Sequence, residues 1–124
     1  MTTAGTIGVT GIDATYYLVK DLERATAFYT KLLGTAPTMA FPGMASEWTF
    51  PGGSTFGLYQ PDDGWHAASG VMFSVPDMAA AIAAAKTIGV KFADDGKIEE
   101  TPVCLMAFAE DSEGNTFLLH QPKG

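Results

Sequence analysis

The sequence predicts an α+β domain made of two copies of one strand–helix–strand–strand–strand unit. The first observation is a repeated helix signal. Residues 21–34 and 77–89 each open with aspartate, continue as an apolar-rich helix and end with glycine, and the two aspartates are 77 − 21 = 56 positions apart. The second is a repeated strand, because residues 55–61 resemble residues 116–122 at an offset of 116 − 55 = 61. The two matches occur in the same order at nearly the same offset, so a duplicated unit explains them better than chance similarity does.

The first helix is predicted at residues 21–34. Asp21 suits the N-cap, where a carboxylate accepts hydrogen bonds from the free backbone N–H groups of the first turn. Gly34 supplies the left-handed residue that commonly ends a helix. Apolar residues recur between them at steps of three and four, so the helix should pack through one stripe against a sheet. The stripe consists of Leu22, Ala25, Phe28, Tyr29 and Leu32.

Strands are expected on both sides of each helix, because β-branched and aromatic residues gather there between turn residues. In the first half they cover residues 12–19, 46–50 and 55–59, with a short strand inside 37–44 that Pro42 and Gly43 interrupt. In the second half they cover residues 70–75, 90–93, 103–109 and 116–120, with a helix at 77–88. Glu99 and Glu100 precede a proline, and we expect them on an exposed edge.

All 124 residues are expected to form one domain. The first module is placed at about residues 12–61 and the second at about 69–122, separated by a turn-rich connector. His66 belongs to this connector and is expected to face solvent. Residues 1–10 are small and rich in threonine and glycine, which favours a loose lead-in.

Composition and charge exclude several classes of partner. Fourteen acidic against seven basic residues give a net charge of −7, which argues against nucleic acid and anionic membrane surfaces. Hydrophobic residues make up 47% and charged residues 17%, as in a globular protein. The single Cys104 lies in an apolar run, so we expect a buried thiol and no internal disulfide. No signal peptide or bilayer-spanning run is present, and a cytoplasmic location is expected.

Two motifs resemble those of the vicinal oxygen chelate superfamily, which includes glyoxalase I, extradiol dioxygenases and bleomycin-resistance proteins. The first is the helix entry and stripe described above, from Val19 to Gly34, and the second is Glu110-Asp111-x-x-Gly114-Asn115 before the last strand. The resemblance extends from about Ile12 to Gln121 and implies the glyoxalase/bleomycin-resistance fold, in which two βαβββ modules curl into a cup for a ligand or a divalent metal. It also implies a homodimer, because two chains complete the cup in many relatives.

The resemblance places four metal-ligand positions in this cup, usually occupied by histidine or glutamate. Counting from the two motifs puts them at Ala14, Gly57, Gly70 and Leu118. A divalent metal needs imidazole or carboxylate donors, and none of these side chains has one. The chain therefore departs from the family pattern, and we expect no metal and no cofactor.

Strand alternation predicts which other side chains line the cup. Counting in steps of two from the ligand positions places eight side chains there: Tyr16, Leu18, Thr55, Tyr59, Met72, Ser74, Thr116 and His120. Of these, Tyr16, Tyr59, Met72, Ser74 and His120 are the candidates for contact with a ligand. Phe41 and Trp48 are added as aromatic surfaces for a planar or cationic ligand. Glu47 is a candidate cation partner or general base, and His120 a candidate general base. The alternative for each is structural: the tyrosines fill the core, and Glu47 and His120 face solvent.

Three functions remain open. The first is metal-independent binding or sequestration of a small aromatic or cationic organic molecule, of the bleomycin-resistance type. The second is a metal-free lyase, isomerase or cyclase in which Glu47, His120 or a tyrosine moves a proton. The third is a structural or interaction module without a ligand. A smooth aromatic face favours binding, converging polar groups favour catalysis, and a cup filled by its own side chains favours the third.

Overall fold

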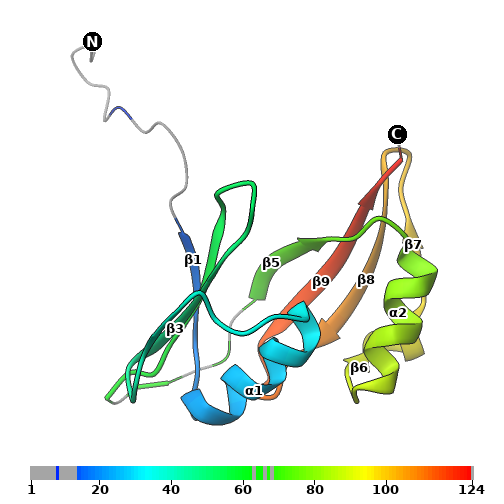
Figure 1. The fold of residues 1–124 in the computed structure, drawn as a ribbon. Helices are drawn as coiled ribbons and strands as arrows, with labels where there is room; N and C mark the ends of the chain where they lie inside the picture. The colour runs from blue at the N-terminus through cyan, green and yellow to red at the C-terminus, as the bar shows by residue number, and fades with distance from the viewer. Residues whose placement is uncertain (1–7, 9–13, 63, 66, 68, 124) are drawn as a thin grey trace.

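The computed structural model describes residues 8, 14–62, 64–65, 67 and 69–123 (Figure 1). The first half contains β1 (Ala14–Leu18), α1 (Leu22–Leu33), β2 (Met39–Phe41), β3 (Ala45–Thr49) and β4 (Thr55–Tyr59). The second half contains β5 (Ser69–Ser74), α2 (Met78–Thr87), β6 (Lys91–Phe92), a 3-10 turn η1 (Ala93–Gly96), β7 (Glu99–Glu100), β8 (Cys104–Glu110) and β9 (Thr116–Pro122). The lead-in expected at residues 1–10 (except Gly8), the first two residues of the strand expected at 12–19 and His66 lie outside the described residues.

The strands form two sheets of corresponding topology. The first has the order β1-β4-β3-β2, and the second has the order β5-β9-β8-β6, with β7 also paired to β8. In each sheet the first strand of its half runs parallel to the last, while the other pairings are antiparallel. The α+β class and the two βαβββ modules predicted from the sequence are thus confirmed. In the second half, the strand expected at residues 90–93 is the two-residue β6, which η1 follows directly. Glu99 and Glu100, expected on an exposed edge, form the short strand β7 paired with β8.

The repeat seen in the sequence is a repeat of helix capping. Asp21 accepts a hydrogen bond from the Arg24 backbone N–H at 3.0 Å, and Asp77 accepts one from the Ala80 N–H at 3.1 Å. The glutamine that ends each module caps the same helix a second time. Gln60 Oε1 accepts from the Leu22 N–H, and Gln121 Oε1 accepts from the Met78 N–H, both at 2.7 Å. Each module therefore closes by satisfying backbone donors at the start of its own helix.

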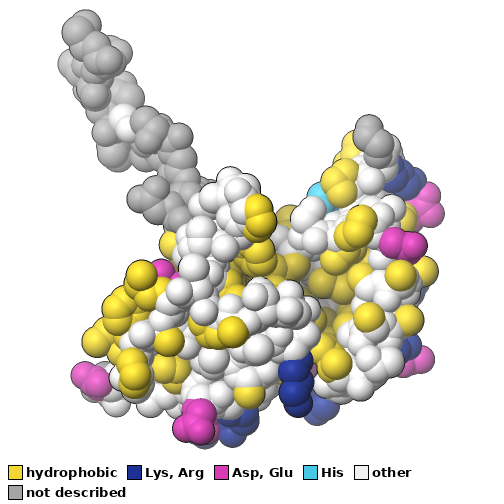
Figure 2. Space-filling model, in the orientation of Figure 1, with side chains coloured by type: hydrophobic (Ala, Val, Ile, Leu, Met, Phe, Trp, Pro, Cys, Tyr) yellow, Lys and Arg dark blue, Asp and Glu magenta, His cyan; other side chains and the backbone are white. Residues whose placement is uncertain are grey.

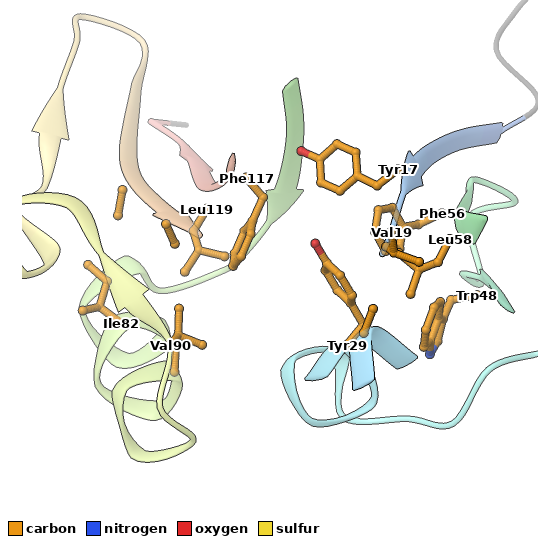
Figure 3. Close-up of a cluster of buried hydrophobic side chains, with 14 of the residues drawn as sticks. Tyr17, Val19, Tyr29, Trp48, Phe56, Leu58, Ile82, Val90, Phe117 and Leu119 are labelled. Atoms are coloured by element: carbon orange, nitrogen blue, oxygen red, sulfur yellow. The ribbon is translucent and has the colours of Figure 1, made fainter. Parts of the chain in front are cut away.

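The core lies between the helices and the sheets and is shared by the two halves (Figure 3). Tyr29 of α1 lies at its centre, with its ring near Trp48, Phe56, Phe73 and Phe117 at centroid distances of 4.8–6.3 Å. Because these rings come from both sheets, neither half buries its aromatic residues alone. Hydrophobic side chains also gather in a hollow at the centre of the surface shown in Figure 2.

The β8–β9 turn ties the second half to the start of α1. The Glu113 side chain is fully buried, and its carboxylate accepts from the backbone N–H groups of Lys20 (3.1 Å) and Asp21 (3.0 Å). It also forms a bidentate ion pair with Arg24 at 2.7 and 2.9 Å and accepts from the Ser112 hydroxyl. Burial alone would raise the pKa of Glu113, but the hydrogen bonds and charge of these neighbours outweigh it and lower that pKa.

The same turn holds the central tyrosine. The Tyr29 hydroxyl donates to Asp111 Oδ2 at 2.7 Å, and Asp111 Oδ1 accepts from the backbone N–H groups of Glu113 and Asn115 at 2.8 Å. Burial, followed by the charge of Asp111, raises the pKa of Tyr29 far above its usual value, so this phenol stays a donor. The second family motif is thus a turn that positions α1. None of the described helices is long and apolar enough to cross a membrane.

Replacing Glu113 with alanine is expected to cost about 2–4 kcal/mol of unfolding free energy, because it removes the acceptor of two backbone N–H groups and the partner of the Arg24 guanidinium. Chemical denaturation at pH 7 measures the loss. Glu23, exposed one residue before Arg24, is the control, and its alanine variant should change stability by less than about 0.5 kcal/mol. Equal losses in the two variants would contradict the assignment.

The lowered pKa of Glu113 also predicts a pH dependence. A carboxyl group that ionises more readily when folded stabilises the fold above its ordinary pKa of 4.5, and this stabilisation is lost as pH falls through the lower folded value. The Glu113→Gln variant should therefore show a smaller fall in unfolding free energy on acidification than the unmodified protein. Parallel slopes for the two proteins would refute this.

Candidate ligand-binding site

Each sheet has one face packed on its helix and one face turned away from it, which we call the cup face. On the first sheet the strand register places Tyr16, Gly57, Glu47 and Met39 in one row across β1, β4, β3 and β2. The Tyr16 side chain is 40% exposed, and Met39 is also exposed. The row therefore presents an aromatic ring, a carboxylate and a thioether side by side on an accessible surface.

Gly57 lets the Tyr16 ring lie flat on the sheet. A Cβ atom added at Gly57 would come within 2.6–2.9 Å of three ring atoms of Tyr16, closer than real Cβ contacts. Any side chain at position 57 would therefore have to displace this ring. The sequence indicates each residue separately as a cup position, but the dependence of one on the other becomes visible only in the register of β1 and β4.

Two further predicted aromatic residues lie in the next row of this face. Tyr59 and Phe41 both pair with Ala45, from opposite sides, and their side chains are 39% and 42% exposed. Together with Tyr16 and Glu47 they form the larger part of the cup face of the first sheet. The structure thus brings four of the predicted site residues together.

Trp48 lies on the opposite face. Its side chain is 1% exposed, packs near Tyr29 and Phe56, and donates its indole N–H to the Thr35 carbonyl at 2.9 Å (Figure 3). Adjacent residues of a strand point to opposite faces, so Trp48 and Glu47 cannot share the cup. The expectation that Trp48 stacks on a ligand therefore does not match its buried position in the core.

The second sheet presents a more aliphatic cup face. Met72, Leu118 and Phe108 form one row across β5, β9 and β8, and Ser74, His120 and Met106 form the next. Met72 is 49% exposed and Phe108 is 37% exposed. Phe108 and Met106 were not among the predicted site residues, although their alternation with buried Ala107 and Ala109 is a signal that could have identified them.

The two candidate proton-transfer groups are not brought together. Glu47 lies in β3 of the first sheet and His120 in β9 of the second, and no side-chain hydrogen bond or ion pair joins either to another described residue. A general acid–base pair needs both groups within hydrogen-bonding reach of one substrate atom. Within one chain, the geometry of these two residues does not provide a paired catalytic centre.

The residues at the four ligand positions do not fit a divalent metal. Ala14, Gly57, Gly70 and Leu118 offer no side-chain donor atom. In the described part of the chain, no three or more His, Cys, Asp and Glu side chains are grouped closely enough to hold a metal ion.

One family model matches nearly the whole chain. The model of the Glyoxalase/Bleomycin resistance protein/Dioxygenase superfamily matches residues 11–119. No curated protein sequence matches the chain.

Solved structures show the same fold at low sequence identity. A glyoxalase/bleomycin resistance protein from Catenulispora acidiphila is 24% identical, with a TM-score of 0.68 and coverage of 87% of this chain and 95% of that one. For a lactoylglutathione lyase from Agrobacterium tumefaciens the identity is 15%, the TM-score 0.76 and the coverage 91% and 94%. An antibiotic binding protein from a Streptomyces species is 22% identical, with a TM-score of 0.75 and coverage of 94% of this chain and 99% of that one. At these identities the likeness establishes the fold, while the reaction or ligand has to be argued from the site.

The contact between Tyr16 and Gly57 predicts a coupled pair of substitutions. Gly57→Ala should cost about 0.5–1.5 kcal/mol of stability, because the new methyl group forces the partly exposed Tyr16 ring out of its preferred position. In a Tyr16→Ala background the same change should cost much less, since the ring is gone. Denaturant unfolding of all four proteins in this cycle gives the coupling energy.

Gly52 provides the matched control for this cycle, because a Cβ added there meets no atom within 4 Å and its φ is not positive. Gly52→Ala should change stability by less than about 0.5 kcal/mol in both backgrounds. A Gly57→Ala cost that is the same with and without the tyrosine would show that the ring does not occupy this position.

Proposed function

Because the chain belongs to the Glyoxalase/Bleomycin resistance protein/Dioxygenase superfamily, we propose that it uses the family cup to bind a small aromatic or cationic organic molecule without a metal. The observation that carries this proposal is the row formed by Tyr16, Gly57 and Glu47. In this row an aromatic ring covers a position that a metal ligand occupies in metal-using relatives.

The row is suited to a planar or positively charged ligand. An aromatic ring face attracts cations and stacks on planar groups, and Tyr16 and Tyr59 present accessible rings. The Glu47 carboxylate is half-buried beside Gly57, with no ion pair to another described residue, so it can pair with a cationic group of the ligand. The net charge of −7 would further favour the approach of a cation.

Binding without turnover is the simplest use of this surface. Sequestration requires affinity and no proton transfer, which agrees with the separation of Glu47 and His120 into different sheets. The structurally similar protein from Streptomyces is described as antibiotic binding, and we extend that kind of role to this chain as part of the proposal. On this proposal Met72, Ser74 and His120 would supply an opposite wall with a thioether, a hydroxyl and an imidazole.

We also propose that a second copy of the chain covers the cup face. Large hydrophobic side chains remain exposed on both sheets in one chain, among them Phe41, Met72 and Phe108. Exposed apolar surface of this kind favours association, and pairing of two copies would bring the face of one sheet opposite that of another.

The assembly is tested by size-exclusion chromatography with light scattering. The expected mass is twice 13.1 kDa, and Phe108→Asp should shift the protein toward 13.1 kDa by placing a charge on the cup face. Ala83→Asp on the exposed side of α2 is the control and should leave the mass unchanged. A mass of 13.1 kDa for the unmodified protein at micromolar concentration would overturn the dimer proposal.

Ligand binding is tested by thermal shift on chelator-treated protein, with acridine orange as a planar aromatic cation and divalent metals as a separate arm. A ligand that binds only the folded state raises the melting temperature by mass action. Acridine orange should stabilise the protein, Glu47→Gln should weaken its binding by about tenfold, and the exposed control Glu23→Gln should not. Stabilisation by a metal and not by the dye would contradict the proposal.

A further inference from the structure

A groove separates the two helices on the face opposite the cup. Its volume is about 740 Å³, within the usual range of small-molecule sites. The C-terminal turn of α1, the β3–β4 hairpin, β5 and α2 form its walls. The hydrophobic side chains in the central hollow of Figure 2 lie where these elements meet. We call this space the inter-helix groove.

The groove exists because α2 has two apolar faces. Met78, Ile82 and Ala85 are buried against the second sheet. A second stripe at Ala81, Ala84 and Ile88 has helical spacing of three and four but lines the groove. Alanine side chains fill little of the space toward α1, so this stripe stays accessible.

The opposite wall is also apolar. Leu32 and Leu33 come from α1 and Phe50 from the hairpin, while Phe73 and Val75 extend from β5 on its helix-facing side. Tyr16, Glu47 and Gly57 are not part of these walls, so the inter-helix groove is distinct from the row that carries the proposed function. Met72 and Ser74 border it as well, because β5 is the edge strand of its sheet.

Lys31 is the single charged side chain among the described residues that line the groove. Its ammonium forms no ion pair or hydrogen bond with another described residue, whereas Lys86 on the outer side of α2 pairs with Asp95. The hydroxyls of Ser54 and Ser74 also line the groove and have no side-chain partner in the described part of the chain. In a strongly acidic protein, an apolar groove with one free cation and free donors is complementary to an anion with an apolar body.

We propose that the inter-helix groove binds an amphipathic monocarboxylate. Its hydrocarbon portion lies between α1 and the Ala81, Ala84 and Ile88 stripe of α2, and its carboxylate lies at Lys31. Burial of the hydrocarbon supplies most of the affinity, and the ion pair with Lys31 selects a carboxylate over a neutral head group.

The proposal is tested by calorimetric titration of the full chain with sodium decanoate, kept below its critical micelle concentration. A second titration uses 1-decanol as a neutral analogue. Decanoate should bind saturably at one site per chain. Lys31→Gln should weaken the binding of decanoate by about two- to fivefold, the range of an exposed ion pair, and should leave the binding of decanol unchanged. Lys91→Gln, an exposed lysine on β6 outside the groove, is the charge control and should change neither.

A second pair of variants tests the location. Ala84→Trp places a large ring in the groove and should weaken both probes by about tenfold or more. Ala83→Trp, one residue away on the exposed side of α2, should leave both affinities unchanged. Melting temperatures establish that each variant is folded. If a tryptophan variant does not fold, Lys31→Gln alone still tests the proposal.

Two results would overturn the proposal: no saturable decanoate binding, or decanoate binding that Lys31→Gln and Ala84→Trp both leave unchanged. The Glu47→Gln variant should retain decanoate binding, since Glu47 does not line the groove. This site is therefore judged independently of the acridine orange result.

Discussion

The carboxylate of Glu113 lies where the two halves of the chain meet and accepts hydrogen bonds from the start of α1 and from its own turn. Five donor groups surround it: two backbone N–H groups, two guanidinium nitrogens of Arg24 and the Ser112 hydroxyl. A buried charge is tolerated only when its hydrogen-bonding capacity is satisfied, and the short side chains and turn geometry here achieve that. The position of α1 follows from this contact, and the position of Tyr29 in the shared core follows from α1.

The two halves repeat their local structure but contribute differently to the whole. Both use an aspartate and a distant glutamine to cap a helix. Helix α1 reaches across to the other half through hydrogen bonds of Arg24 and Tyr29, and it carries a polar face as well as an apolar one. The alanine-rich α2 packs on its own sheet and leaves a second apolar stripe uncovered. The asymmetry of the two helices produces both the shared core and the inter-helix groove.

Much of the fold could be predicted from short-range signals. The caps at Asp21 and Asp77, the glycine stop at Gly34 and the strand at residues 55–59 depend on neighbouring residues, and all appear as predicted. The role of Glu113 could not be predicted in this way, because its partners are about ninety positions away in sequence. The strand β7 at Glu99 and Glu100 likewise depends on pairing with β8.

The candidate site was predictable where strand alternation alone decides which face a residue occupies. Tyr16, Tyr59 and Met72 follow the two-residue period and lie on the cup faces. Trp48 is a candidate only because of its aromatic ring, and its neighbour Glu47 occupies the cup-facing position of that strand. Whether Glu47 and His120 approach each other depends on the arrangement of two sheets, which no local pattern encodes.

The close packing of Tyr16 on Gly57 also limits how this chain can change over evolutionary time. A histidine or glutamate introduced at position 57 would collide with the ring, and a smaller residue at position 16 would by itself leave the neighbouring position without a donor. A metal-binding side chain at this point therefore has to displace the tyrosine ring toward solvent or follow its replacement. The order in which the two positions change thus affects the cost of each step.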